Sequence, residues 1–501
     1  MNQCKYVLEQ YIILLEEQGL IRYVRSEEEA LKQEVGYLSY DSKDMKPGGM
    51  FICKGAHFLP AYLDEAVERG AFCYVSEEEY EPLKKDAAAI IVNDIRKSMA
   101  LLANRFYNEA WRRLNLIGIT GTKGKSTVTY YVKYILDHYL AAMGKPPCAV
   151  LSGIDVDDGV ILEESHLTTP EAVMLHRHFK NAADSGREYL TMEVSSQALK
   201  YDRTAGVNFT AGCYLNVGED HISPIEHSDF DDYFESKLKL FKQCDIACIN
   251  FDADHAQEVC DAVDPQSRII TFGTNEGSDI YGHRIVSKEG GIDFEVRTPS
   301  FTHEFSLGMT GLFNVENALA AISICYGLNI PVKSMYEGLL TARVPGRMEL
   351  FTGERSGTLV IVDYAHNRMS FDRLFRSTIK EYPNRRITAV FGCPGKKALA
   401  RRSELSEIAG RYSAKIYITE EDAGEEDVMA ICGEIASHVR KTGCRYEIEP
   451  DRGEAIRKAI EEADENTVIL LTGKGRETRQ KRGVLYIDCP SDVEYVLQYL
   501  K

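Results

Sequence analysis

A glycine-rich segment with hydroxyl and lysine residues lies between a strand-like run and a helix-like run of the chain. This segment, TGTKGKST at positions 120–127, follows the apolar run LIGI and precedes the helical pattern VTYYVKYILDHYL. Glycines let backbone N–H groups approach phosphates, a lysine neutralises charge on the β- and γ-phosphates, and a serine hydroxyl can reach Mg²⁺. The N-terminus of the following helix adds to the same anion site. The segment therefore predicts a site for ATP or GTP.

The spacing of this loop departs from the common phosphate-binding pattern G-x-x-x-x-G-K-[ST]. That pattern would need glycine at position 119, where the chain has Ile119, and Gly121 falls inside the loop instead. We expect the whole segment to bind the nucleotide, through Thr120, Gly121, Thr122, Lys123, Gly124, Lys125, Ser126 and Thr127.

An acid, a histidine and a lysine follow the loop in that order. Glu193 ends a strand pattern in MEVSSQALKYDR, His221 follows another strand in LNVGEDHISP, and Lys237 lies in the helical pattern DDYFESKLKLF. Taken singly, each has an ordinary explanation: a solvated acid at a strand end, a loop histidine and a surface lysine. Their combination after a phosphate loop is what favours a functional role.

Strands and helices alternate along most of the chain, and these elements must position the side chains. In the last third, four strand patterns end in DYAH, GCPGKK, TEEDAG and TGKGRE, with helical patterns between them. Such alternation predicts an α/β fold of parallel sheets covered by helices. Ligands bind at the carboxyl ends of such strands, and all four ends are polar or rich in glycine. Because turns after strands are generally polar, ordinary surface turns are the alternative explanation for these four segments.

Length and composition limit the classes of function. The chain has 501 residues and a formal net charge of -18, which argues against a protein that mainly holds nucleic acid or an anionic membrane. No apolar run approaches the roughly 20 residues that span a bilayer, and the first residues lack the features of a signal peptide. The 13 cysteines are scattered without a C-x-x-C pair, which indicates core thiols in a reducing cytoplasm.

Motifs across the whole chain resemble those of the Mur ligases. The loop fits their pattern T-G-T-x-G-K-[ST], and the three following residues fit their E-x-S-S, N-x-x-x-D-H and Y-x-x-x-K-x-x-L-F elements. The segment GLFNVENALAA also matches the family's G-x-x-N-x-x-N-A-x-A-A. The resemblance is strongest to the E-type ligases, which join an amino acid to UDP-N-acetylmuramoyl-L-alanyl-D-glutamate.

The resemblance implies that ATP phosphorylates a substrate carboxylate with the help of Mg²⁺. Ser126 and Glu193 would hold one Mg²⁺, and His221 and a carbamylated Lys237 would serve a second, with Lys125 as a further catalytic residue. Divalent metals screen the repulsion between the two anions that must meet. An ammonium group cannot bind Mg²⁺, whereas a lysine carbamate offers the hard oxygen ligands that Mg²⁺ prefers.

Three residues of the later segments would complete the nucleotide site by the same resemblance. Asn317 would meet adenine, Arg347 in VPGRMEL would reach the nucleotide from a linker, and Asp363 in VDYAH would meet the ribose. An asparagine that caps a helix is the alternative explanation for Asn317.

The first block of the chain resembles the uridine-binding module of E- and F-type Mur ligases. Ser42 in YDSK would bind the UDP moiety, with the loop from Lys54 to His57 close by. The muramoyl-dipeptide would meet Thr168 and Thr169 of HLTTPE and Ser195 and Arg203 of EVSSQALKYDR, while Tyr201 stands where the family has glutamine. We therefore expect three domains: a mixed α/β uridine-binding domain at 1–110, a parallel-sheet ATPase of the P-loop type at 111–340 and a Rossmann-like amino-acid-binding domain at 341–501.

The amino-acid domain departs most from the family. Enzymes that add meso-diaminopimelate carry D-N-P-R at a strand end, where this chain has Glu421, Asp422, Ala423 and Gly424. Loss of the arginine, which would clamp the distal carboxylate, and the acids of ITEEDAGEED favour a cationic side chain such as that of lysine or ornithine. Acids at a helix start are the equal alternative. We expect the amino acid to meet Lys397, Asp422, Gly473 and Glu477, with Glu477 receiving its attacking amine.

These inferences predict a monomeric cytoplasmic ligase of peptidoglycan precursor synthesis that uses ATP and Mg²⁺. Its partners would be UDP-MurNAc-dipeptide and an amino acid, with no nucleic acid and no insertion into a membrane. Two alternatives stay open: a Mur-like ligase acting on another acidic acceptor, and a non-catalytic homologue that binds nucleotide and wall precursor as a regulatory subunit.

Overall fold

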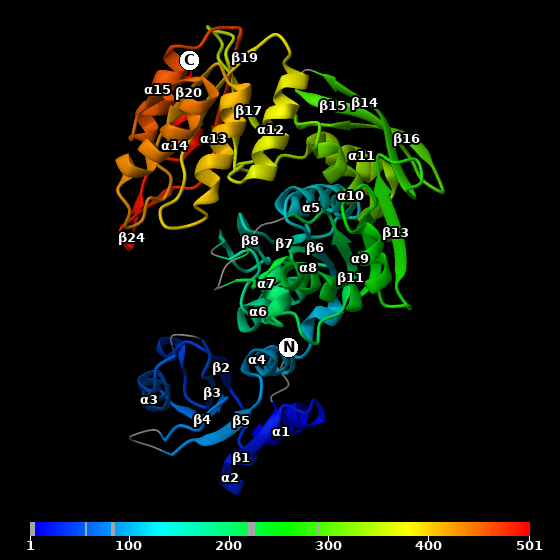
Figure 1. Ribbon diagram of the computed structural model, residues 1–501. Coiled ribbons are helices and arrows are strands. Elements are labelled where there is room, and N and C mark those ends of the chain that lie inside the picture. The colour runs from blue at the N-terminus through cyan, green and yellow to red at the C-terminus, as the bar shows by residue number, and fades with distance from the viewer. Residues whose placement is uncertain are drawn as a thin grey trace. The chain divides into compact units, whose positions relative to one another are not determined.

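The computed structural model describes residues 6–55, 58–81, 86–165, 167–218, 222, 226–288 and 290–500 (Figure 1). It divides into two units, and each is described by itself. The first unit comprises Met1–Thr129, Leu136–Ile270 and Tyr326–Ile330, and the second comprises Tyr130–Ile135, Thr271–Cys325 and Pro331–Lys501. None of the helices in these described ranges is long and apolar enough to cross a membrane.

The first unit begins with a five-stranded sheet in the order β1-β5-β4-β3-β2. All neighbouring pairs are parallel except β1 and β5. Its strands are β1 (Ile21–Arg25), β2 (Tyr37–Ser39), β3 (Gly49–Ile52), β4 (Ala71–Ser76) and β5 (Ala88–Val92), and its helical elements are α1 (Leu8–Glu17), α2 (Glu28–Leu31), η1 (Ser42–Asp44), α3 (Pro60–Glu68) and α4 (Ile95–Phe106). Helices α1 and α4 bury apolar residues on one face, and α3 does so on the other. This is the mixed α/β arrangement that the sequence predicts.

A second sheet of the first unit carries the phosphate loop. Within this unit its strands run in the order β12-β11-β6-β10-β7-β8-β9. Their bounds are β6 (Asn115–Thr120), β7 (Ala149–Leu151), β8 (Asp155–Asp157), β9 (Leu162–Glu164), β10 (Tyr189–Glu193), β11 (Phe209–Tyr214) and β12 (Cys244–Asn250). The central strands β7, β10, β6, β11 and β12 are parallel, so their carboxyl ends meet at one edge. The loop after β6 and the residues after β10 and β11 therefore lie together.

Helices pack on this central sheet around a continuous apolar core. They are η2 (Ala110–Arg113), α6 (Ala172–Asp184), α7 (Ser196–Lys200), α8 (Phe230–Leu238), η3 (Lys239–Lys242) and α9 (Ala256–Ala262). Leu175 and Phe179 of α6 and Tyr233 and Phe234 of α8 belong to the core. Both faces of the parallel strands are buried, which explains their uninterrupted apolar runs in the sequence.

Three elements have residues in both units: α5 (Lys125–Ala141), β13 (Arg268–Gly273) and α10 (Asn314–Gly327). The second unit then adds an antiparallel set, β14 (Ile280–Lys288), β15 (Gly291–Arg297) and β16 (Thr302–Leu307), and α11 (Val332–Thr341). A Cβ on Gly282 of β14 would lie 2.7 Å from the Leu319 side chain, so α10 packs closely on this sheet.

A six-stranded sheet in the order β17-β18-β22-β19-β20-β21 forms the rest of the second unit. Only β17 pairs antiparallel. The strands are β17 (Glu349–Thr352), β18 (Leu359–Asp363), β19 (Arg386–Phe391), β20 (Lys415–Ile418), β21 (Arg445–Ile448) and β22 (Thr467–Thr472). The helices are α12 (Arg368–Glu381), α13 (Ala400–Tyr412), α14 (Val428–Thr442), α15 (Arg452–Glu461) and α16 (Asp492–Tyr499), and the hairpin β23 (Arg479–Arg482) and β24 (Leu485–Asp488) lies beside them.

The predicted α/β fold class is confirmed. The domain limits at 110 and 340 stay a prediction.

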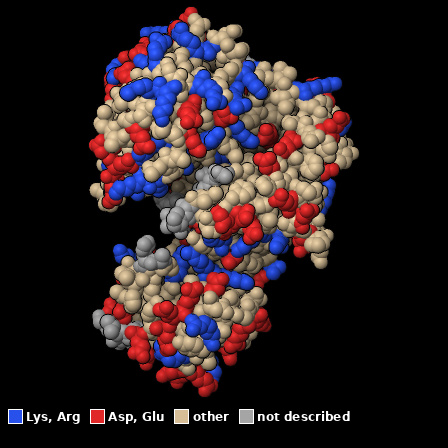
Figure 2. All heavy atoms as spheres, in the orientation of Figure 1, with Lys and Arg blue, Asp and Glu red and all other residues tan. Residues whose placement is uncertain are grey.

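Acidic and basic side chains are interspersed over the visible face, where Asp and Glu are spread rather than gathered (Figure 2).

Candidate functional site

The phosphate loop joins β6 to α5 in the first unit. Gly124 has a φ of +90°, a conformation that favours glycine, and it directly precedes Lys125, the first residue of α5. Nζ of Lys125 donates to the carbonyl oxygens of Gly121 and Thr122 at 2.9 and 3.4 Å. The lysine side chain thus folds back over the loop at the N-terminus of a 17-residue helix. This geometry suits the phosphates of a nucleotide.

Asn216, which follows β11, holds the loop through backbone atoms of Lys123. Its Oδ1 accepts the Lys123 N–H at 2.9 Å, and its Nδ2 donates to the Lys123 carbonyl at 3.1 Å. Its own carbonyl accepts the N–H of Thr122 at 3.0 Å. These bonds require no particular side chain at position 123. The role of Asn216 was not predicted, and its only signal in the sequence is its place as the first letter of N-x-x-x-D-H.

Glu193 lies beside the loop because β10 and β6 are parallel neighbours, with Glu193 in register with Ile119. The side chain is buried, with the residue only 2% exposed, and its Oε1 accepts the N–H of Gly153 at 2.7 Å. A Cβ on Gly153 would lie 3.5 Å from both Glu193 Oε1 and Thr168 Oγ1, so the Thr168 hydroxyl shares this corner. Glu193 is therefore a buried carboxylate and not a solvated acid at a strand end.

Lys237 on α8 is also buried, with 1% of the residue exposed. Its Nζ lies 4.2 Å from the centre of the Tyr233 ring, and the Tyr233 hydroxyl lies 2.9 Å from that of Thr122. Helix α8 is thus joined to the phosphate loop through Tyr233. His221, the remaining predicted metal ligand, lies outside the described residues. Within the described ranges, no group of three His, Cys, Asp or Glu side chains forms a metal-binding cluster.

Thr169 and Ser195 shape the turn after β10. The Thr169 hydroxyl donates to the Glu193 carbonyl at 2.9 Å and accepts the Ser195 N–H at 3.0 Å. The Ser195 hydroxyl accepts the N–H of Ala198 at 3.1 Å and so caps α7. Both hydroxyls hold the backbone that carries Glu193, a role that the sequence did not reveal.

Arg203 lies next to this turn in a network with Glu171 and Lys54. Its guanidinium donates to the Thr169 carbonyl at 2.8 Å and to Glu171 Oε1 at 2.6 Å. Nζ of Lys54 donates to the other oxygen of Glu171 at 2.6 Å. Burial alone would raise the pKa of Glu171, but Arg203 and Lys54 hold it below its usual value. The structure therefore brings together Thr168, Thr169, Ser195 and Arg203, and it adds Lys54, which was expected near the UDP moiety; their binding of a substrate stays a prediction.

Ser42, the predicted contact of the UDP moiety, is buried in η1. Its hydroxyl donates to Glu65 Oε2 at 2.7 Å, and the same carboxylate accepts from Arg69 on Oε1 at 3.1 Å. A ligand hydrogen bond to Ser42 would therefore share this hydroxyl with Glu65. His57, which the sequence places nearby, lies outside the described residues.

The remaining predicted nucleotide contacts belong to the second unit. Both carboxylate oxygens of Asp363 accept backbone N–H groups, from Met348 at 2.9 Å and Ala365 at 2.8 Å. The Arg347 guanidinium lies 4.6 Å from the centre of the Tyr364 ring. Asn317 is not a helix cap, since α10 begins at Asn314, and its Nδ2 donates to the Asn314 side chain at 2.9 Å.

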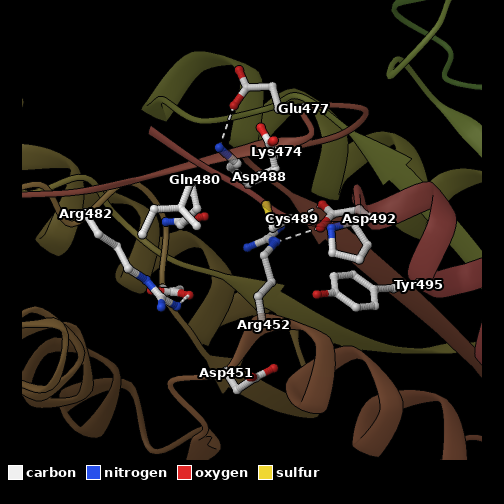
Figure 3. Close-up of a pocket in the computed structure, with 13 residues that line it drawn as sticks. Asp451, Arg452, Lys474, Glu477, Gln480, Arg482, Asp488, Cys489, Asp492 and Tyr495 are labelled. Carbon is white, nitrogen blue, oxygen red and sulfur yellow. Dashed lines mark hydrogen bonds and ion pairs between the residues drawn. The ribbon is translucent and has the colours of Figure 1, made fainter. Parts of the chain in front are cut away.

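A pocket of about 110 Å³ lies at the carboxyl ends of the strands in the second unit (Figure 3). Lys474 and Glu477 line it and form an ion pair at 2.7 Å. Glu477 also accepts the Tyr364 hydroxyl at 2.6 Å. The lining holds five acids and three basic groups: Glu420, Asp451, Glu477, Asp488, Asp492, Arg452, Lys474 and Arg482. Each basic group pairs with an acid of the lining, as Arg452–Asp492, Lys474–Glu477 and Arg482–Glu420, so the excess of acids rests on Asp451 and Asp488.

The acids of the segment 420–426 have distinct environments. Four of them form ion pairs within the second unit, as Glu420–Arg482, Asp422–Lys474, Glu425–Lys396 and Glu426–Arg402. Glu421 differs, because burial raises its pKa to about 7. A Cβ on Gly473 would lie 2.3 Å from Glu421 Oε2, so only glycine leaves room for this carboxylate. Lys397 is exposed. Because four of the five acids are paired with cations, their number alone is a weak argument for an amino acid with a cationic side chain.

Comparison with known proteins decides the family. Residues 119–325 match the Mur ligase middle domain, and residues 346–475 match the domain described as Mur ligase, glutamate ligase domain. The UDP-N-acetylmuramoyl-L-alanyl-D-glutamate--L-lysine ligase of Enterococcus faecalis is 37% identical over 457 residues, which cover 90% of this chain and 88% of that protein. The chain belongs to the Mur ligase family. The resemblance inferred from the sequence is confirmed.

Other similarities of this Mur ligase agree. The UDP-N-acetylmuramyl-tripeptide synthetase of Lactobacillus delbrueckii subsp. bulgaricus is 36% identical over 94% of this chain and 95% of that protein. A solved structure of UDP-N-acetylmuramoyl-L-alanyl-D-glutamate--2,6-diaminopimelate ligase has a TM-score of 0.69 at 22% identity and covers 99% of both chains. At that identity, the solved structure supports the fold alone.

The structure shows the surroundings of two places where this Mur ligase departs from the family motifs. In DYAHNRMS, where Arg368 and Met369 stand in place of the family's Pro-Asp, the preceding Asn367 caps α12, with its side chain accepting the N–H of Ser370 at 3.1 Å. Arg476, where the family has histidine, forms a bidentate ion pair with Glu349. Its Nε and Nη2 donate to the two carboxylate oxygens of Glu349, each at 2.7 Å. Glu349 follows the linker residues VPGRM, so Arg476 ties the GKGRE loop to the linker.

Proposed function

We propose that this Mur ligase joins L-lysine to the D-glutamyl residue of UDP-MurNAc-L-Ala-D-Glu, using ATP. The observation that carries this proposal is the 37% identity, over nine-tenths of the chain, to a ligase named for these substrates. A second ligase named for L-lysine, from Streptococcus thermophilus, is 34% identical over 93% of the chain. The pocket of the second unit agrees with an amino acid that has a second cationic group, because its lining holds five acids and three basic groups.

The reaction proceeds in two steps. An oxygen of the D-glutamyl side-chain carboxylate attacks the γ-phosphorus, the bond to the β-phosphate oxygen breaks, and ADP leaves. The amine of lysine then attacks the acyl carbon, and phosphate leaves with the former carboxylate oxygen. The amine nitrogen gives up a proton, for which Glu477 is the candidate acceptor. The loop residues 120–127 bind the phosphates, and Lys125 stabilises their charge.

Mg²⁺ is the expected companion of ATP, and the residues present fit it. Glu193 is a buried carboxylate, and the described contacts of its side chain are with a neutral donor, the N–H of Gly153. A buried carboxylate without a cationic partner is a natural ligand of a hard cation. We propose that Ser126 and Glu193 hold one ion and that His221 and Lys237 serve a second. Bound Mg²⁺ would screen charge between the two anionic reactants.

Lys237 can serve in this way only after modification. We propose that its neutral amine adds to CO₂ with release of one proton, which gives a carbamate with two oxygen atoms. The place of Lys237 supports the proposal, because the residue is buried beside Tyr233, whose hydroxyl contacts the phosphate loop at Thr122.

In the second unit, Lys397 would bind the carboxylate of the incoming amino acid, and Asp422, Gly473 and Glu477 would line its site. Asp422 acts through Lys474, with which it is paired at 3.1 Å. We also propose that the chain works as a monomer in the cytoplasm, where ATP and UDP-sugars are available.

A substrate screen tests the proposal. Phosphate release is measured with ATP, Mg²⁺ and UDP-MurNAc-L-Ala-D-Glu against the twenty amino acids, ornithine and meso-diaminopimelate. We expect turnover with L-lysine that requires all components. Turnover with diaminopimelate alone would overturn the specificity, and turnover with another acidic acceptor in place of the dipeptide would assign a different ligase. Binding of ATP and dipeptide without turnover for any amino acid would indicate a regulatory homologue.

A further inference from the structure

The first unit gathers positive charge around a single carboxylate. Glu171, which precedes α6, pairs with Lys54 after β3 and with Arg203 after α7, each at 2.6 Å. Arg96, in the first turn of α4, also lowers the pKa of Glu171, although it does not pair with it directly. The cluster of Lys54, Arg96 and Arg203 therefore has more positive charge than Glu171 neutralises.

Arg96 is held by an aromatic ring rather than by an acid. Its guanidinium carbon lies 3.4 Å from the centre of the Tyr201 ring, which is the distance of face-to-face contact. In the described part of the chain, no hydrogen bond or ion pair engages this guanidinium. Stacking occupies the face of the group and leaves the N–H groups at its edge for another partner.

The position of Tyr201 connects this stack with the substrate site. Tyr201 follows α7 and lies two residues before Arg203, which binds the carbonyl of Thr169. Its ring supplies the surface on which the Arg96 guanidinium rests.

We propose that Arg96, stacked on Tyr201, is a further substrate-binding residue whose guanidinium edge receives an oxyanion of the nucleotide-sugar–dipeptide. The inference rests on the proposed function and adds a residue to its substrate site. A planar guanidinium binds a carboxylate or a phosphate through two parallel hydrogen bonds. Stacking fixes the side chain before the ligand arrives, so less conformational freedom is lost on binding.

Kinetics of matched variants test this role. We expect Arg96→Gln to raise the KM for UDP-MurNAc-L-Ala-D-Glu by about tenfold or more, with kcat and the KM values of ATP and lysine within twofold of the wild type. Lys97→Gln removes the same charge one residue away and should change none of these values. Tyr201→Phe keeps the ring and should behave like the wild type, whereas Tyr201→Leu should raise the same KM, and adding it to Arg96→Gln should have no further effect.

Two substrate analogues distinguish the source of the oxyanion. One carries a carboxamide in place of the α-carboxylate of D-glutamate, and the other is MurNAc-L-Ala-D-Glu without the nucleotide. The ratio of kcat/KM between wild type and Arg96→Gln should fall close to one for the analogue that lacks the anion bound by Arg96. A full ratio with both analogues would overturn the proposal.

The outcome for wild type separates the two proposals. If the wild-type enzyme shows no turnover with dipeptide, lysine and ATP, the proposed function fails. If the wild type turns over and Arg96→Gln matches Lys97→Gln, only the role of Arg96 fails. Thermal unfolding of each variant shows whether a raised KM comes with a loss of folded protein.

Discussion

The hydroxyl of Tyr233 lies 2.9 Å from that of Thr122, while the Nζ of Lys237 lies 4.2 Å from the centre of the same ring. One side chain of α8 thus contacts both the phosphate loop and the lysine proposed to become a carbamate. The two contacts use different parts of tyrosine, so they can be separated by mutation.

Tyr233→Phe should weaken ATP binding while leaving the surroundings of Lys237 in place. The variant loses one hydrogen bond, worth about 1 kcal/mol, and keeps the ring. We expect the KM for ATP to rise by about fivefold. Tyr233→Leu removes the ring as well and should also lower kcat. Equal kinetics for the two variants would contradict separate roles for the hydroxyl and the ring.

Asn216→Ala should impair the enzyme far more than Lys123→Ala. Asn216 makes two side-chain hydrogen bonds to the backbone of position 123, and those bonds survive a change of the Lys123 side chain. At about 1 kcal/mol each, their loss predicts a decrease of about tenfold or more in ATP affinity. Isothermal titration with a non-hydrolysable ATP analogue measures it. A larger effect from Lys123→Ala would show that the loop depends on that side chain instead.

Lys237→Ala should abolish turnover, since no carbamate can form. Lys237→Arg keeps the positive charge but cannot form the carbamate, and it should be equally inactive. Both variants should retain binding of UDP-MurNAc-dipeptide, measured by titration, because this binding uses other residues. Wild-type rates in either variant would remove the carbamate from the mechanism.

Glu421→Gln should stabilise the protein at high pH and not at low pH. Burial raises the pKa of Glu421 to about 7, above that of an unfolded glutamate. The neutral form is therefore favoured in the folded state, and stability is lost as the pH rises from about 4.5 through 7. The glutamine variant lacks this loss.

Urea unfolding at pH 5 and pH 8 measures the effect. The gain from Glu421→Gln should be small at pH 5 and grow toward about 3 kcal/mol at pH 8. Glu425→Gln is a suitable control, because Glu425 is exposed and paired with Lys396. If the gain in free energy of unfolding does not change with pH, the pKa of Glu421 is not raised in the folded protein.

Arg476→Gln should affect the GKGRE loop and, through it, Glu477. The substitution removes the paired contact to Glu349 and leaves that carboxylate with the N–H of Gly346. We expect kcat to fall several-fold, with the KM for ATP less affected, because Glu477 is the candidate acceptor of the proton. Glu349→Gln should give the same change, and the double variant should be no worse than either single one. Additive losses would indicate independent roles.

Local patterns predicted the framework of the molecule, and contacts between distant residues did not follow from them. The strand, glycine turn and helix around residues 115–141 are adjacent in the chain, so periodicity and composition are enough to reveal them. Asn216 meets Lys123 across 93 residues, and Tyr233 meets Thr122 across 111. Such pairs depend on the order of strands in the sheet, which a single sequence does not specify. Thr169 and Ser195 illustrate this. The sequence predicts that they contact the muramoyl-dipeptide, whereas in the structure their hydroxyls hold the turn that carries Glu193.

The environment of charged groups was the least predictable feature. Five acids in the segment 420–426 look alike in the sequence, yet four are paired with cations and Glu421 is buried. The partner cations come from several separate segments of the chain. Burial and pairing are properties of the assembled sheet, and they decide which of these acids remains available for a ligand.

The hairpin of β23 and β24 offers a place for a reporter group. Its stem is tied to the strand-end segment, since the Lys481 N–H donates to Asp422 and the Gly424 N–H donates to the Lys481 carbonyl. Its turn exposes Val484 by 77% and Leu485 by 67%. A fluorophore attached in a Val484→Cys variant would sit on the hairpin whose Gln480, Arg482 and Ile487 line the amino-acid pocket. Its emission could then follow the arrival of lysine in real time, without interrupting catalysis.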